Sequence, residues 1–162
     1  MSAPTTSLVV RPMSEADVEP LAAALGWPAY GIERRWNERK AGYREMFVAA
    51  VDGRPVGSVS INEKPEAPGL LHLFALDVAE LHRNRGIGAR LIERMEDIAR
   101  DRRSTGVCLE VSVQNAGARR LYARLGYRPE GAPFANQWNR YDAEGNLAEE
   151  VVETVERMVK RF

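Results

Sequence analysis

The alternation of apolar and polar residues along the chain predicts strands and helices that follow one another. The apolar run Leu70–Val78 has the length of a buried strand. After a short Arg/Gly loop, apolar residues recur at helical spacing and predict a helix over residues 86–103. Val107–Val113 is another apolar run of strand length. These three segments form a βαβ unit, so we expect the two strands to be parallel with a right-handed crossover.

The N-terminal part predicts further strands and helices before this unit. Residues 1–6 predict a loose tail without a signal-peptide core. The predicted elements are a strand over Ser7–Arg11, a helix to about Leu25, a helix over Ile32–Lys40, and a hairpin of Met46–Val51 with Pro55–Ile61. Ser14 or Asp17 can cap the first helix, and Pro20 favours Asp17 because proline is tolerated only in a first turn. The Asp52-Gly53 pair is a strong hairpin signal.

The C-terminal part predicts a short helix and a closing hairpin. Asn115 caps the helix and Gly126 ends it, and Tyr127 begins an extended segment. The hairpin consists of Gln137–Tyr141, a turn over residues 142–146 and a return strand that ends near Val159. Four aromatic residues near the second helix either pack that helix on the sheet or line a pocket; they are Trp27, Tyr30, Trp36 and Tyr43.

Length, charge and cysteine content limit the class of protein. With 162 residues we expect one domain, spanning 1–162. Basic and acidic residues balance at 23 each, which argues against a nucleic-acid-binding protein. The single cysteine, Cys108, excludes an internal disulfide and favours a reducing compartment, so we expect a cytoplasmic location. No apolar run has membrane-spanning length, so no membrane association is expected.

The loop before the long helix has the properties of a pyrophosphate-binding site. It runs Arg83-Asn84-Arg85-Gly86-Ile87-Gly88. The first helical amides have no partner within the helix, and the helix dipole adds positive charge there. The two glycines allow an anion close to the backbone, and the two arginines add charge. A P-loop would need Gly-Lys-Ser/Thr, and a dinucleotide fingerprint needs another glycine spacing. The alternative is a glycine turn that only begins the helix.

These residues, with a second segment, carry a family resemblance. The loop is similar to the Arg/Gln-x-x-Gly-x-Gly/Ala motif of the GNAT-superfamily N-acetyltransferases, and Leu109–Tyr127 resembles their strand, Asn-x-x-Ala, Leu-Tyr and Leu-Gly-Phe/Tyr segment. The resemblance covers residues 7–162. It implies an α/β fold, called α+β in some schemes. The implied sheet is twisted, mixed and mostly antiparallel, with about six or seven strands and two splayed central parallel strands, and helices cover both its faces.

The same resemblance implies acetyl-CoA as acyl donor and no metal ion. Asn115 would both cap its helix and contact the pantetheine arm, and Tyr122 would lie at the thiol. The pantetheine would bond the backbone of Leu76, Asp77 and Val78. The pyrophosphate would be held by Arg83, Asn84, Arg85, Gly86, Ile87, Gly88 and Ala89.

Transfer of an acyl group to an amine needs an acid and a base. Tyr122 is the expected acid for the leaving thiolate, although it shares a helix face with apolar residues and could be a core tyrosine. Glu110 lies twelve residues earlier, as in GNAT protein N-terminal acetyltransferases, where a strand glutamate is the base. We expect its pKa to be raised by an apolar cleft. His72 is the rival base. Either residue could instead be structural, Glu110 in a salt bridge and His72 as a buried hydrogen-bonded group.

Two functions remain open from the sequence. The first is acetyl transfer from acetyl-CoA to a primary amine of a small molecule or peptide, by direct attack in a ternary complex. The second is a catalytically silent acyl-CoA-binding sensor or regulatory protein. The acceptor site is expected from residues 25–45 and the hairpin around Phe134–Tyr141. Exposed strand edges make a homodimer plausible.

Overall fold

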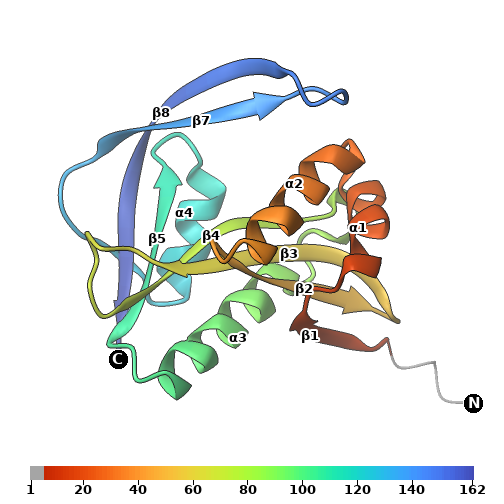
Figure 1. Ribbon diagram of the computed structural model, residues 1–162. Coiled ribbons are helices and arrows are strands. Elements are labelled where there is room, and N and C mark those ends of the chain that lie inside the picture. The colour runs from red at the N-terminus through yellow and green to blue at the C-terminus, as the bar shows by residue number, and fades with distance from the viewer. Residues whose placement is uncertain (1–5) are drawn as a thin grey trace, which may run out of the picture. The chain divides into compact units, whose positions relative to one another are not determined.

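The computed structural model describes residues 6–162, so the predicted tail over residues 1–6 lies outside the described part except for Thr6. Within that part, eight strands are hydrogen-bonded in the order β1-β2-β3-β4-β5-β8-β6, with β7 paired to β8 (Figure 1). The sheet is mixed, with the parallel pair β4 and β5 among antiparallel neighbours, as predicted. The count exceeds the predicted six or seven strands because the two residues of β6 form a strand of their own.

The chain divides into two compact units, which we describe separately. The first comprises the described residues up to Ser60 together with Ala75–Arg94, and the second comprises Ile61–Phe74 with Met95–Phe162. β3 (Arg54–Glu63), β4 (Leu70–Val78) and α3 (Ile87–Asp101) each run through both. The prediction of one domain over 1–162 stays a prediction.

The first unit holds the N-terminal strands and helices. Its remaining elements are β1 (Leu8–Pro12), η1 (Glu15–Asp17), α1 (Val18–Leu25), α2 (Ala29–Lys40), β2 (Glu45–Val51) and η2 (Glu80–His82). Asp17 holds the N-cap position of α1 but makes no side-chain cap bond there, so the prediction that it caps this helix was wrong. Its carboxylate accepts instead from the Ser14 amide at 2.8 Å and from Arg11 at 2.7 Å. Gly26 ends α1 in the left-handed region, as predicted. Asp52 and Gly53 both have positive φ, which confirms the predicted tight turn. The core comprises Met13, Val18, Leu21, Ala22, Ile32, Trp36, Met46 and Val48.

Two sequence predictions in this unit need adjustment. α2 begins at Ala29, three residues before the predicted start, because Pro28 precedes it as the N-cap and proline favours helix starts. The short helix η2 was not predicted, because a single turn has no apolar periodicity to detect.

The second unit is built on strand pairing around β8. Its remaining elements are β5 (Gly106–Ser112), α4 (Ala116–Arg124), β6 (Arg128–Pro129), β7 (Phe134–Tyr141) and β8 (Leu147–Arg161). β7 begins three residues before the predicted Gln137, and β8 extends two residues beyond Val159. The earlier start follows from pairing, because Phe134 lies opposite Val155 on β8. Buried Ala67, Leu70, Cys108 and Val159 pack together in this unit.

The parallel pairing of β4 with β5 is short. It joins Leu70 to Gly106, Leu71 to Val107 and His72 to Cys108. β8 covers the other edge of β5 over seven residue pairs, and in that register Glu110 lies opposite Arg157. This pairing brings charged and polar side chains from β4, β5 and β8 to one region of the second unit.

Candidate functional site

The loop before α3, in the first unit, has the geometry of an anion-binding helix N-terminus. The first helical bond runs from the Arg90 amide to the Gly86 carbonyl at 3.0 Å. The amides of Ile87, Gly88 and Ala89 therefore have no acceptor within the helix. Gly86 has φ +77°, which favours glycine, and a Cβ built there meets no atom within 4 Å. An anion can thus approach these amides closely.

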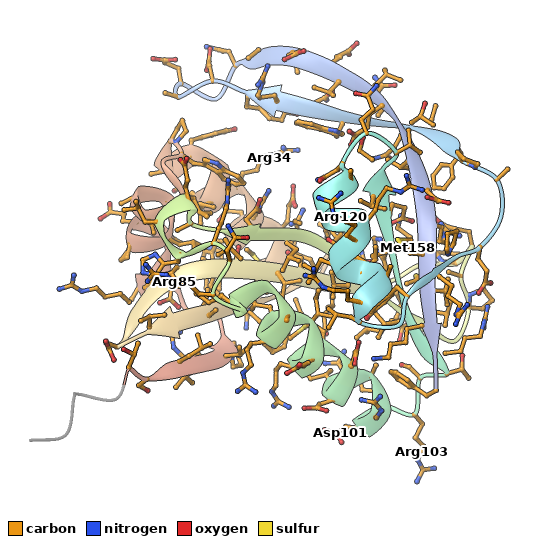
Figure 2. All side chains as sticks on the ribbon, turned by 180° about the vertical axis from the view of Figure 1, so that it is seen from behind. Arg34, Arg85, Asp101, Arg103, Arg120 and Met158 are labelled. Atoms are coloured by element: carbon orange, nitrogen blue, oxygen red, sulfur yellow. The ribbon has the colours of Figure 1, made fainter. Side chains whose placement is uncertain are left out.

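The arginines of this loop differ in their surroundings. Arg83 is exposed, and its Nε donates to the carbonyl of Val78 at 3.1 Å, which ties the loop to the end of β4. Arg85, labelled in Figure 2, is exposed on the same loop, as is Asn84, whose φ is positive. The structure therefore brings Arg83 and Val78 together, and it leaves the charge of Arg85 at the surface.

The last residues of β4 are held by neighbours within the first unit. The carboxylate of Asp77 accepts a hydrogen bond from Arg35 of α2 at 2.9 Å. A Cβ at Gly57 would lie 2.9 Å from the Asp77 carbonyl oxygen, so only glycine allows β3 this close. Ala75 has φ +52°, an uncommon value for a residue with a Cβ, and it bends β4 just before Leu76. The side chain of Asp77 is occupied, so its main chain is the part left for a ligand.

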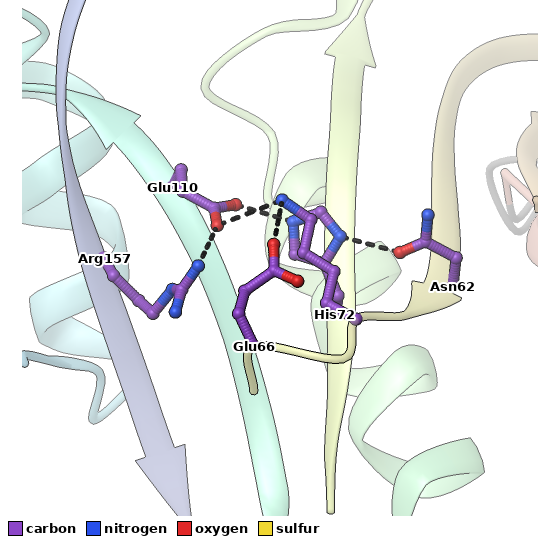
Figure 3. Close-up of polar contacts among 6 residues, drawn as sticks. Asn62, Glu66, His72, Glu110 and Arg157 are labelled. Carbon is purple, nitrogen blue, oxygen red and sulfur yellow. Dashed lines mark hydrogen bonds and ion pairs between the residues drawn. The ribbon is translucent and has the colours of Figure 1, made fainter. Parts of the chain in front are cut away.

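A second group of site residues lies in the second unit and is shown in Figure 3. The ring of His72 is buried, with 4% of its side chain exposed, and Glu110 beside it is 12% exposed. Nε2 of His72 lies 2.6 Å from Oε2 of Glu110, and Nδ1 lies 2.8 Å from Oδ1 of Asn62. The two residues that the sequence offered as rival bases are therefore direct partners.

Two cations hold the other oxygen of Glu110. Arg157 donates to Oε1 at 3.0 Å, and Lys64 lies 3.4 Å from the same atom. Partial burial alone would raise the pKa of Glu110, but the hydrogen bond and charge of His72 outweigh it. With the help of Lys64 and Arg157 they lower the pKa to about 2. The expectation of a raised pKa was therefore wrong, because His72, Lys64 and Arg157 reach the carboxylate only through contacts between distant parts of the sequence.

Tyr122 lies on α4, in the second unit. Its side chain is buried, and its ring meets that of Tyr127 edge-on with centroids 6.2 Å apart. Asn115 caps α4, as predicted, because its Oδ1 accepts from the amide of Ala118 at 3.1 Å. Arg119 of α4 donates to Glu156 of β8 at 2.7 Å, which anchors the helix on that strand. The helix thus holds Tyr122 in one orientation.

Sequence reasoning missed three residues of this site: Asn62, Lys64 and Arg157. None of them lies in a motif. Arg157 had one detectable signal, its position on the predicted return strand, but the register that places it opposite Glu110 is not visible in the sequence.

Of the four aromatic residues near α2, Trp36 alone is buried among the described residues. Of the two alternatives from sequence, packing therefore applies to Trp36. Tyr30 and Tyr43 line an open cavity of about 400 Å³ in the first unit, together with Glu33, Arg34, Asn37, Glu38 and Ala41. Carboxylates and aromatic rings are groups that suit a cationic or amine ligand.

Comparisons with known proteins agree with the sequence resemblance. Residues 12–127 match the acetyltransferase (GNAT) family. The chain is 37% identical to N-acetyltransferase 8B of Rattus norvegicus over 79 residues. The aligned segment covers 49% of this chain and 36% of that protein. The match thus covers little more than a third of the relative's length.

Solved structures show the same fold. The ribosomal-protein-S18-alanine N-acetyltransferase of Escherichia coli superimposes with a TM-score of 0.68 at 18% identity, over 96% of this chain and 94% of that one. A Bacillus anthracis protein solved in complex with acetyl coenzyme A gives a TM-score of 0.57 at 18% identity, over 74% of this chain and 62% of that one. At these identities the likeness concerns the fold.

Proposed function

Because the chain belongs to the GNAT acetyltransferase family, we propose that it transfers the acetyl group of acetyl-CoA to a primary amine of a small molecule or peptide. The observation that carries the proposal is the span of the family match. Residues 12–127 include the Arg/Gly loop, both members of the His72–Glu110 pair, and Tyr122. The donor-binding and proton-handling residues are thus all inside the segment that defines the family.

The acyl donor binds, in this proposal, through main-chain groups of the first unit. The amides of Ile87, Gly88 and Ala89 hold the pyrophosphate, with Arg83, Asn84 and Arg85 adding donors and charge. The backbone of Leu76, Asp77 and Val78 bonds the pantetheine amides. Asn115 of the second unit offers its amide nitrogen, since its oxygen already caps α4. The Bacillus anthracis relative, solved with acetyl coenzyme A, supports the choice of donor.

The chemical step is a direct attack of the amine on the thioester. The ammonium group of the acceptor first loses a proton, its nitrogen then bonds to the acetyl carbon, and the carbon–sulfur bond breaks. The thiolate takes a proton from the Tyr122 hydroxyl, and the second proton that the nitrogen loses on becoming an amide restores that hydroxyl. A covalent cysteine intermediate is not supported, because burial and the nearby Glu110 charge raise the pKa of Cys108, to about 11. A thiol with that pKa is not a nucleophile near neutral pH.

The proton of the ammonium passes to the His72–Glu110 pair. Glu110 is the more exposed member of the pair, so the proton reaches its carboxylate first. Because the pKa of Glu110 is low, the carboxylate does not stay protonated. His72 then holds it at Nε2, 2.6 Å from the carboxylate. The sequence offered Glu110 and His72 as alternative bases, and in this proposal the two act as a pair.

The acceptor is an amine because the candidate surfaces combine aromatic and acidic groups. Tyr30, Tyr43, Glu33 and Glu38 line the open cavity of the first unit. In the second unit, Phe134 and Trp138 are 39% and 43% exposed on β7, and the Trp138 indole donates to Glu153 at 3.2 Å. These groups favour an acceptor with a positive charge and an apolar portion.

The proposal also includes location, assembly and partners. A cytoplasmic location is supported by the buried, reduced Cys108. No helix among residues 6–162 combines the length and apolar character needed to cross a membrane. A homodimer is supported by the exposed β7–β8 hairpin. We also keep the expectations of a protein without metal and without nucleic-acid partners.

The proposal is tested by a mass-spectrometric acceptor screen. Purified protein and acetyl-CoA are incubated with pooled amino acids, polyamines, aminoglycosides and short peptides, with Tyr122→Phe in parallel. We expect one acceptor to gain a single acetyl group, and the variant to lose that product. If a sample that binds CoA forms no product with acetyl-, propionyl- or succinyl-CoA, the proposed transferase activity is contradicted and a silent acyl-CoA sensor is favoured.

A further inference from the structure

Asn62, at the end of β3, makes a contact that determines how His72 carries its protons (Figure 3). Oδ1 of Asn62 lies 2.8 Å from Nδ1 of His72. An amide oxygen has no hydrogen to donate, so the hydrogen of this bond belongs to Nδ1. Neutral imidazole has one N–H, and in this arrangement it is on the side away from Glu110.

The other ring nitrogen is thereby available to accept a proton. In the neutral ring with Nδ1–H, Nε2 has a lone pair that faces Oε2 of Glu110. Two lone pairs do not approach to 2.6 Å unless a proton lies between them. The 2.6 Å separation is therefore the right one for a single accepted proton, which would lie between Nε2 and Oε2.

The surroundings keep the ring in place and Glu110 ionised. The ring of Phe74 stacks on His72 with centroids 5.0 Å apart and an interplanar angle of 7°. The titratable or charged groups that face the pair in the second unit are Lys64 and Glu66 of the β3–β4 segment, Cys108 and Glu110 of β5, and Arg157 of β8. Lys64 and Arg157 both contact Oε1, so the shared proton is left with Oε2 and Nε2.

We propose that Asn62 is a positioning residue for acetyl transfer, because its side-chain oxygen selects the Nδ1–H tautomer of His72 and so makes Nε2 the atom that accepts the proton. This inference rests on the proposed function. The N–H bond of the acceptor ammonium breaks, and its electron pair stays on nitrogen for the attack. The proton passes to Glu110 and comes to rest between Oε2 and Nε2. The bond from Nδ1–H to Asn62 is unchanged throughout.

The tautomer can be read directly by NMR, without any activity. The sequence has two histidines, so a ¹H–¹⁵N spectrum of the imidazole groups has two sets of signals, and His82→Gln assigns them. In the neutral ring of His72 we expect Nδ1 to be protonated and Nε2 to be unprotonated. In Asn62→Ala we expect the Nε2–H form, which donates to Glu110. A wild-type Nε2–H form, or an unchanged tautomer in Asn62→Ala, would overturn the inference.

Kinetics distinguish positioning from a structural role. We expect Asn62→Ala to lower kcat about tenfold while the Kd for CoA stays within about twofold. Asn62→Asp keeps an oxygen acceptor at the same place, so it should restore the tautomer and most of kcat, with the acidic limb of the pH–rate profile moved to higher pH. An Asn62→Ala protein with wild-type kcat and profile would refute the role of Asn62 in transfer. If wild-type protein transfers no acetyl group, the proposed function fails, and the spectra still decide whether Asn62 sets the tautomer.

Discussion

Each oxygen of Glu110 contacts a residue of a different strand: Nε2 of His72 on β4 lies 2.6 Å from Oε2, and Arg157 of β8 donates to Oε1 at 3.0 Å. The carboxylate therefore joins the strands on both sides of β5 in the second unit. Its 12% exposure shows that it is desolvated on most sides. A charge in this position is stable only while its cationic partners remain. Removing the charge should therefore change both stability and chemistry.

Glu110→Gln should remove a pH-dependent part of the free energy of unfolding. The pKa of Glu110 is lowered from its usual 4.5 to about 2, so its contribution is present above pH 4.5 and is lost as pH falls toward 2. By linkage the contribution is roughly 3 kcal/mol at neutral pH. Chemical denaturation at several pH values should show a large wild-type advantage at pH 7 that disappears near pH 2.

The control for this measurement is Glu93→Gln on α3. Glu93 is 52% exposed and lies 3.8 Å from Arg90, and such surface pairs contribute little. We expect its effect to stay within about 0.5 kcal/mol at every pH. A Glu110→Gln protein with the same pH dependence as wild type would contradict the assignment of the low pKa.

Tyr122→Phe should lower kcat about 10²-fold or more and leave the Kd for CoA within about threefold, because the hydroxyl acts on the leaving sulfur and not on binding. The matched control is Tyr127→Phe, whose hydroxyl donates to the buried Glu96 at 3.1 Å. That variant should lose about 1–3 kcal/mol of stability and keep kcat. Steady-state kinetics with CoA titration separates the two. A fully active Tyr122→Phe would remove the acid role.

Gly86→Glu should abolish CoA binding measured by calorimetry. The substitution places a negative charge at the helix N-terminus, and it adds bulk where the structure has open space. Gly131→Glu is the matched control, because Gly131 has φ +80° against +77° for Gly86 and also meets nothing within 4 Å. Backbone strain and added charge are thus equal in the two variants. Equal loss of CoA affinity in both would show that the loop is not the pyrophosphate site.

Asp77→Asn should change the Kd for CoA by no more than about threefold. The carboxylate of Asp77 is occupied by Arg35 at 2.9 Å, so the residue offers its main chain to a ligand. Arg35→Met combined with Asp77→Asn should show a coupling energy of about 0.5–1 kcal/mol in unfolding experiments. A tenfold loss of CoA affinity in Asp77→Asn would mean that its side chain binds the donor directly.

The fold could be predicted from sequence wherever neighbouring residues decide the conformation. The Asp52-Gly53 turn, the Asn115 cap and the Gly26 helix end were all correct, because each depends on contacts within a few residues. The start of β7 was missed, since it depends on pairing of Phe134 with Val155, twenty-one residues later. Local signals contain no information on such pairing.

For the candidate site, the sequence by itself determined the loop that can bind an anion, the helix that carries Tyr122, and the identity of His72 and Glu110 as the titratable candidates. Only the tertiary structure decided what these two residues do together. The bond from His72 joins residues 38 positions apart, and those from Lys64 and Arg157 join residues 46 and 47 positions apart. A pKa depends on all charges within a few ångströms, and here strand register and the path of the segment between β3 and β4 determine which charges those are.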